Sequence, residues 1–288
     1  MKKIAVLTDF SERSFNAAEY ALSLAIRLRA NILLYHSFLV PSAEPMSAQI
    51  AWPLEDYEVI KTGCEAELAQ MKAKLEKKLE LLPEGFHPGI ESRAQDGVYD
   101  LAINEFLKDR EVVLIVIANH HKGFASLILG NHTREVLDHS TLPLLVVPEH
   151  SRFQKINKIA FATDLNKADL DIIQSLSSLA RPFNAEILLT HLSKPAPQDD
   201  PQVQDILTRV SNQINYPHIY YRELTETQLQ EGLQDMAQAV QADLMVMVHR
   251  HKDLWSRLLG SSHSQKLAST TQLPLLIYPY PVTHLPVF

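Results

Sequence analysis

Cysteine is almost missing from this chain, which has one, Cys64, among 288 residues. A single thiol cannot form a disulfide within the chain, and no Cys-x-x-Cys pair is present for metal or redox chemistry. A chain built without disulfides is typical of a reducing compartment, so the sequence predicts a cytoplasmic protein. Cys64 lies in a helical stretch, and we expect it to be a packing or surface residue.

Long apolar runs and basic runs are missing as well. No stretch reaches the ~20 apolar residues of a membrane-spanning helix. The run that follows Lys2 and Lys3 ends at Thr8, which is too early for a signal peptide. The formal net charge is −7 and no basic cluster stands out, so a nucleic-acid-binding surface is not expected. The sequence therefore predicts neither a membrane nor a nucleic acid as a partner.

Sequence motifs of well-known enzymes are also absent. The chain has no Gly-x-Ser-x-Gly, no phosphate-binding P-loop and no paired carboxylates at a recognisable catalytic spacing. Glycine is scarce, with eight residues in all. These absences predict a protein that is not an enzyme and that has no resident cofactor.

The chain does contain an internal duplication. The segment KIAVLTDFSERS at 3–14 recurs as KIAFATDLNKAD at 158–169, and ANILLYHS at 30–37 recurs as AEILLTHL at 185–192. Near the end of each half a further segment recurs, as STLPLLVVP at 140–148 and as TTQLPLLIYP at 270–279. Repeated segments in the same order indicate two homologous domains, which we place at 1–150 and 151–288.

Each half alternates strands with helices, which predicts an α/β fold. In the first half we expect strands at 3–8, 31–37, 89–96, 112–118 and 142–148, with helices over 14–29, 55–81, 98–108 and 131–140. Runs such as VVLIVIA and LMVMV are apolar on both faces, as buried parallel strands are. The pattern predicts a doubly wound parallel sheet, with ligands beyond the carboxyl ends of the strands. An apolar fifth strand at a sheet edge needs cover, so we expect the two fifth strands to pair.

On these residues the chain resembles the universal stress protein family in its tandem form. The resemblance rests on Thr8-Asp9 and Thr163-Asp164 after the first strands, and on His36 and His191 after the second. It also rests on LILGNHTREVLDHSTLPLLVVP and its counterpart RLLGSSHSQKLASTTQLPLLIYP. The resemblance implies five-stranded sheets of strand order 3-2-1-4-5, paired through their fifth strands.

Many members of that family bind ATP through the pattern Gly, two residues, Gly, nine residues, Gly, and then Ser or Thr. Aligned on Gly130, the pattern places Ile117 and His120 at the first two glycine positions and Asn131 last. Aligned on Gly260, it places Met247 and Arg250 at those positions and Ser261 last. Both halves lack the first two glycines, so we do not expect ATP to bind in the family's usual mode.

The candidate ligand-binding residues lie at these strand ends and loops. Asp9 and Asp164 occupy positions where the family contacts a nucleotide, and either could instead cap the following helix. Small-anion sites are a second candidate, built from helix amides and basic side chains. The full candidate set is Asp9, His120, Lys122, Gly130 and Asn131 in the first half, and Asp164, His251, Lys252, Gly260 and Ser261 in the second.

Several other residues leave alternatives open. The loop histidines include His120, His121 and His132 in one half and His249, His251 and His263 in the other, but their spacings differ and we assign no metal site. His36 and His191 are expected to be hydrogen-bonded structural residues. The insertion at 39–57 is either an apolar lid or a surface loop, and Trp255 is expected to pack its loop down.

The sequence thus predicts a cytoplasmic, non-enzymatic stress-response protein whose clefts hold a small ligand or contact a partner protein. The main alternative is a protein that binds ATP or another adenine nucleotide, with slow hydrolysis. In that case the second half is the better candidate, through Asp164, Gly260 and Ser261. A third interpretation is a purely structural dimerisation module. The two halves are expected to form an internal pair, and the chain could further form a homodimer.

Overall fold

The computed structural model describes most of both halves. The described residues are 1–39, 57–97, 108–119, 136–137, 139–193, 201–225, 233–249, 273–280 and 285–288. The expected helices over 98–108 and 131–140 lie largely outside this part, as does most of the insertion at 39–57.

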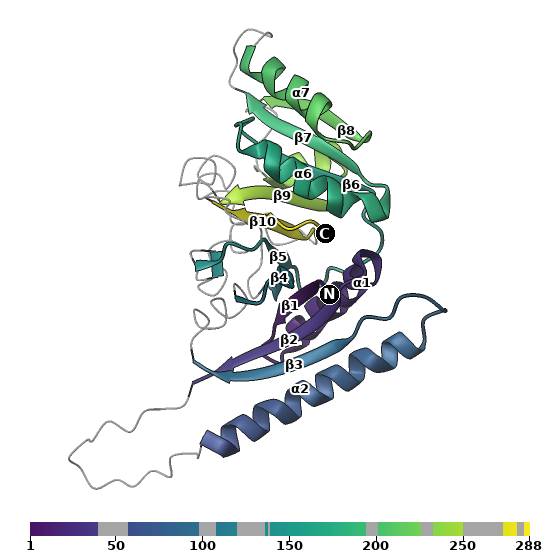
Figure 1. The fold of residues 1–288 in the computed structure, drawn as a ribbon, viewed down its shortest axis with the longest axis vertical. Helices are drawn as coiled ribbons and strands as arrows, with labels where there is room; N and C mark the ends of the chain where they lie inside the picture. The colour runs from purple at the N-terminus through teal and green to yellow at the C-terminus, as the bar shows by residue number, and fades with distance from the viewer. Residues whose placement is uncertain are drawn as a thin grey trace, which may run out of the picture.

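Ten strands form one sheet that runs through the whole molecule (Figure 1). Its order is β3-β2-β1-β4-β5-β10-β9-β6-β7-β8, so the order 3-2-1-4-5 occurs in each half, as predicted. The strands are β1 (Lys3–Leu7), β2 (Asn31–Phe38), β3 (Ile90–Asp96), β4 (Val112–Ala118), β5 (Leu144–Val147), β6 (Lys158–Thr163), β7 (Glu186–Ser193), β8 (Ile219–Thr225), β9 (Leu244–His249) and β10 (Leu275–Pro279).

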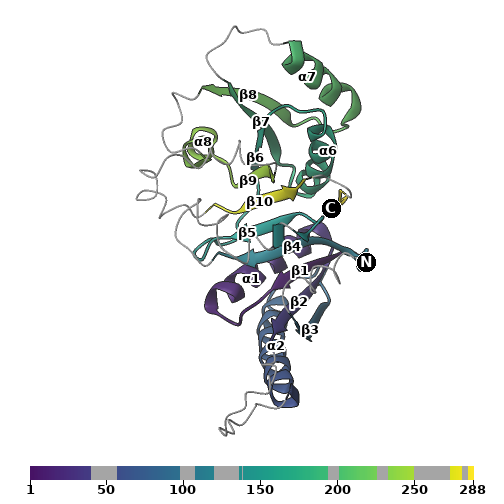
Figure 2. The same cartoon turned by 90° about the vertical axis from the view of Figure 1, so that its left-hand side faces the viewer.

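Helices cover both faces of this sheet. In Figure 2, α6 and α8 lie on opposite sides of the second-half strands. The helices are α1 (Glu12–Leu28), α2 (Tyr57–Glu80), α6 (Asp169–Ala180), the short 3₁₀ helix η1 (Arg181–Phe183), α7 (Pro201–Gln213) and α8 (Leu233–Val240). Because both faces are covered, every residue of β4 is buried, which explains its unbroken apolar sequence.

The two halves are joined through their fifth strands, as the apolar edges predicted. β5 and β10 pair antiparallel, with Leu276 opposite Leu145. All other strand pairs in the sheet are parallel. The antiparallel pair also places the carboxyl end of β5 beside the amino ends of β9 and β10. The stretch 148–157 can therefore reach the start of β6 without crossing the sheet.

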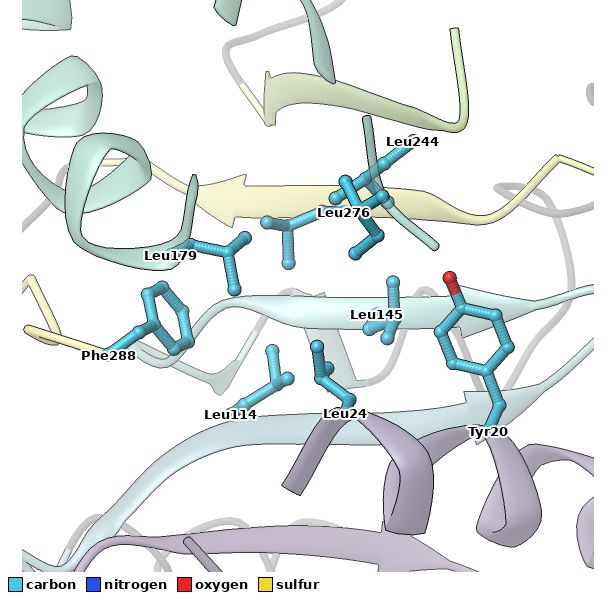
Figure 3. A pocket seen from close by; sticks show the side chains of 9 residues that line it. Tyr20, Leu24, Leu114, Leu145, Leu179, Leu244, Leu276 and Phe288 are labelled. Atoms are coloured by element: carbon cyan, nitrogen blue, oxygen red, sulfur yellow. The ribbon is translucent and has the colours of Figure 1, made fainter. Parts of the chain in front are cut away.

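An apolar layer, which we call the seam, packs over the junction of β5 and β10. Leu24 of α1 and Leu179 of α6 meet there over Leu145 and Leu276 (Figure 3). Phe288 closes one end of the layer, where its backbone N–H donates to Ser178 Oγ over 2.8 Å. The space left between these side chains is about 10 Å³, which is no more than a single water-sized sphere. The seam is therefore packed like a domain core.

Two tyrosines near the seam should make stability fall at alkaline pH. Burial raises the pKa of Tyr278 and of Tyr20, and the charge of Asp243 raises that of Tyr20 further. Above about pH 10 the unfolded tyrosines ionise while the folded ones stay protonated, so the unfolded state binds fewer protons. The free energy of unfolding should then fall by about 1.4 kcal/mol per pH unit for each tyrosine.

Urea unfolding between pH 9 and pH 11 measures this slope. Changing both Tyr20 and Tyr278 to Phe should flatten it, whereas Tyr280→Phe should not, because Tyr280 is 45% exposed. If the free energy of unfolding depends on pH equally in the parent, the double variant and Tyr280→Phe, then Tyr20 and Tyr278 are not the cause of that dependence.

Candidate functional site

The carboxyl ends of neighbouring parallel strands bring the same sequence features together in each half. In the first half, the ends of β1, β2 and β4 carry Thr8-Asp9, His36 and Asn119, which we call the first strand-end site. The corresponding ends of β6, β7 and β9 carry Thr163-Asp164, His191 and His249, the second strand-end site. Because β5 and β10 are antiparallel, the two sites lie at opposite ends of the strands.

A tight turn after the first strand presents each aspartate. In the first site Phe10 has φ 64° and its N–H donates to Thr8 Oγ1 over 3.0 Å. In the second site Leu165 has φ 54° and donates to Thr163 Oγ1 over 2.8 Å. Left-handed backbone is uncommon for such bulky side chains. This repeated conformation leaves both aspartates exposed at the ends of the strands.

The histidines are held in the same way in both sites. His36 Nδ1 lies 2.7 Å from the backbone oxygen of Thr8, and His191 Nδ1 lies 3.0 Å from that of Thr163. A carbonyl oxygen can only accept, so Nδ1 carries the proton in both rings and Nε2 is left as the acceptor when the ring is neutral. Both histidines are thus hydrogen-bonded structural residues, as expected.

Neither aspartate is a helix cap. The N-cap of α1 is Ser11, whose side chain accepts from the N–H of Ser14. Asp9 Oδ1 instead accepts from the N–H and the hydroxyl of Ser11, over 3.1 and 2.6 Å. In the second half the N-cap position is Ala168, which makes no side-chain cap bond. The capping hypothesis for Asp9 and Asp164 is therefore wrong.

The two sites differ in what holds the threonine. Thr8 Oγ1 lies 2.9 Å from the hydroxyl of Ser14. In the second site the equivalent residue is Asp169, whose Oδ2 accepts from Thr163 Oγ1 over 2.6 Å and from the N–H of Asn166 over 3.0 Å. Asp169 is fully buried. The second turn is thus fixed by a buried carboxylate and the first by a neutral hydroxyl.

Charge near the first site also differs from the second. Arg13, in the first turn of α1, forms an ion pair of 3.2 Å with Glu149, just beyond β5. The equivalent of Arg13 in the second half is Ala168. The two strand-end sites therefore share a backbone turn and a histidine but present different charges.

The structure places the residue at the first glycine position of the pattern inside the sheet in both halves. Ile117 in β4 is 7% exposed and pairs with Val146. Met247 in β9 is 1% exposed and pairs with Ile277. Both side chains belong to the apolar core on the face of the sheet that α8 covers. Bulky side chains therefore fill the space at both positions.

Most of the predicted site residues lie outside the described part of the chain. These are His120, Lys122, Gly130, Asn131, His251, Lys252, Gly260 and Ser261, together with the loop histidines His121, His132 and His263 and with Trp255. Sequence reasoning missed the roles of Ser11 and Asp169, although both follow the Thr-Asp pair closely. Among the described residues no group of three or more His, Cys, Asp or Glu could hold a metal ion.

Comparison with known families agrees with this arrangement. The model of the universal stress protein family matches the chain twice, over residues 1–148 and 155–279. The chain belongs to the universal stress protein family. The two matches make it a tandem member, as its duplicated segments predicted.

Individual universal stress proteins are similar in sequence to about half of this chain. Universal stress protein A of Escherichia coli is 28% identical over 142 residues, which cover 42% of this chain and 92% of that protein. A universal stress protein of Methanocaldococcus jannaschii is 27% identical over 147 residues, covering 51% of this chain and 81% of the relative.

Solved structures of the family share the fold. A universal stress protein from Archaeoglobus fulgidus aligns with a TM-score of 0.58 and 15% identity, covering 96% of each chain. A putative universal stress protein from Pseudomonas aeruginosa aligns with a TM-score of 0.57 and 13% identity, covering 97% of this chain and 93% of the other. Within the described part of the chain, no helix combines the length and apolar character needed to cross a membrane.

Proposed function

We propose that this universal stress protein is a non-enzymatic stress-response protein whose strand-end sites hold a small ligand or contact a partner protein. Membership of the family supports the stress-response part of this proposal. The scarcity of cysteine supports a cytoplasmic location. The absence of a Gly-x-Ser-x-Gly or P-loop motif supports a role in binding over catalysis.

One observation carries the proposal that ATP is not bound in the family's usual mode. Ile117 and Met247 stand where the glycine pattern has its first glycine, and both are buried core residues. A glycine would let backbone amides approach the phosphates closely, whereas these side chains fill the space. Asp9 and Asp164 are exposed at the strand ends, where we propose that they contact a ligand smaller than a nucleotide.

ATP binding in the second half is the alternative function. There Gly260 is followed by Ser261, so the last two positions of the pattern are present, whereas Gly130 is followed by Asn131. The buried Asp169 also holds the turn that presents Asp164. If either half binds an adenine nucleotide, these residues favour the second.

Isothermal titration of the nucleotide-stripped protein with ATP and Mg²⁺ tests the proposal. We expect no binding tighter than roughly 1 mM, about 4 kcal/mol. The same titration with Asp164→Ala and Ser261→Ala, and with Asp9→Ala as the first-half control, assigns any binding that occurs. Micromolar binding that is lost in the two second-half variants and kept in the control would overturn the proposal in favour of the alternative.

A further inference from the structure

The two edge strands of the sheet occupy equivalent places but carry different residues. Ile90 of β3 pairs with Ile32, and Ile219 of β8 pairs with Ile187, which is the counterpart of Ile32 in the duplication. Counting from these partners, Glu91 and Ser92 of β3 correspond to Tyr220 and Tyr221 of β8. Charged residues on an edge strand discourage another chain from pairing with it. The edge of β8 lacks the charge that β3 has at this point.

The helices beside these edges also differ in length. α2 has 24 residues and packs along β3, burying Leu68, Met71, Leu75 and Leu79 (Figure 1). α7 has 13 residues and ends at Gln213, six residues before β8 begins. Between the end of α7 and the start of β8 lies a groove of about 740 Å³. It lies at the amino end of β8, away from the second strand-end site.

The groove combines an apolar floor with tyrosines and uncharged polar groups. Its floor includes Leu189, Leu207 and Val210, and its rim includes asparagine, glutamine and serine side chains from 211–215. Among the described residues that line it there is no aspartate, glutamate, lysine or arginine. Tyrosine, serine and asparagine are enriched in the binding loops of antibodies, where tyrosine gives contact area at a low cost in conformational entropy and the small polar residues give hydrogen bonds.

The turn that forms one wall of the groove is held in place before any partner arrives. The hydroxyl of Tyr216 donates to the backbone oxygen of Ala185 over 2.5 Å. Arg181 donates to the backbone oxygen of Asn215 over 2.6 Å, and its guanidinium lies 5.6 Å from the centre of the Tyr216 ring. A wall fixed in this way adds little ordering cost to binding.

The backbone of β8 offers hydrogen-bonding groups along the groove. Among the described strands β8 pairs with β7 alone, and the backbone oxygen of His218 points toward β7, where it accepts from Ile187. Successive residues of a strand alternate in direction, so the N–H and C=O of Ile219 point to the open edge. Tyr220 is 48% exposed beside them.

We propose that this edge binds an uncharged extended peptide, which adds a strand beside β8 and places its apolar side chains in the groove. Backbone hydrogen bonds to the edge would supply much of the affinity, and the groove would select alternate side chains. The uncharged lining favours a peptide without charges, because a charged side chain on this floor would lose water and find no partner. Beyond the groove, Arg222 donates to the backbone oxygen of Ala239, and Glu223 is exposed. These two charged residues limit the uncharged part of the β8 edge to its first three residues, 219–221.

The test uses the full chain and a fluorescent, end-capped hexapeptide that alternates valine and threonine. Fluorescence anisotropy should show saturable binding tighter than roughly 1 mM. Tyr220→Glu, which introduces the residue found at this position in β3, should weaken binding at least tenfold. Tyr280→Glu is the matched control, because Tyr280 is similarly exposed at 45% and lies elsewhere, and it should leave the affinity within twofold. A peptide with N-methylated valines, which lack backbone donors, should bind at least tenfold more weakly.

Hydrogen exchange on the unmodified protein gives a readout that needs no variant. Binding of the peptide should slow amide exchange in 219–221 and leave 90–96 unchanged. Absence of saturable binding, an unchanged affinity in Tyr220→Glu, or protection that falls elsewhere would each overturn the proposal. A dimer in sedimentation that Tyr220→Glu converts to a monomer would overturn it too, and would assign this edge to a second copy of the chain.

Discussion

Changing Leu276 to Asp is expected to lower the free energy of unfolding by about 4 kcal/mol or more. Leu276 is 1% exposed in β10 and lies opposite Leu145 of the other half. It faces the seam, whose described lining residues are all apolar except Tyr20. A carboxylate there would lose its water and gain no cationic partner. Because the seam joins the halves, the cost should fall on their pairing first.

Urea unfolding followed by circular dichroism measures this effect. The matched control is Val287→Asp, because Val287 lies next to Phe288 in sequence but is 67% exposed, and its effect should stay within about 0.5 kcal/mol. If pairing fails before the halves unfold, the variant should show two transitions where the parent shows one. Equal stability of the two variants would show that the seam contributes little.

Changing Asp169 to Ala is expected to cost about 3 kcal/mol, since it removes the carboxylate that accepts two hydrogen bonds inside the protein. Thr163 Oγ1 and the N–H of Asn166 would both lose their acceptor. The equivalent change in the first half, Ser14→Ala, removes a neutral hydroxyl beside Thr8 and should cost about 1 kcal/mol.

Thermal and urea unfolding of the two variants compare the turns directly. Asp169→Asn keeps the shape of the side chain and should give an intermediate loss, because one acceptor oxygen remains but the charge is gone. If Asp169→Ala and Ser14→Ala cost the same, the buried carboxylate does not hold its turn more firmly than the hydroxyl does.

Periodicity and repetition predicted the fold well because the relevant signals are local. The run VVLIVIA coincides with β4, and LMVMV lies within β9, since strands buried on both faces leave few polar positions. The pairing of β5 with β10 followed from their apolar sequence at what would otherwise be an exposed edge. In each case the apolar composition of one segment requires that the segment be buried, and the fold buries it.

The strand-end turns were harder to predict. Phe10 and Leu165 adopt a left-handed backbone that usually signals glycine or asparagine, so neither carries a turn signal in the sequence. The Ser11 cap was missed because Asp9 is an equally good capping residue two positions earlier. The choice between them depends on where the turn ends, which the tertiary hydrogen bonds decide.

The groove beside β8 has no sequence signature at all. It results from the length of α7 relative to α2 and from the position of Ile219 against Ile187. The effect of the helix lengths and the register of Ile219 against Ile187 cannot be recognised in the sequence before the strand pairing is known. The tyrosines of β8 alone would be read as ordinary strand residues, because aromatic side chains are common in strands.

Joining the two halves in one chain changes what a single mutation can do. In an assembly of two identical subunits, each substitution appears twice and alters both copies of a site together. Here Ser14 and Asp169 occupy equivalent positions, and so do Glu91 and Tyr220, yet each pair has diverged. The covalent link also keeps the partner strand at a high effective concentration at any dilution. Either half can therefore change independently while β5 and β10 stay paired.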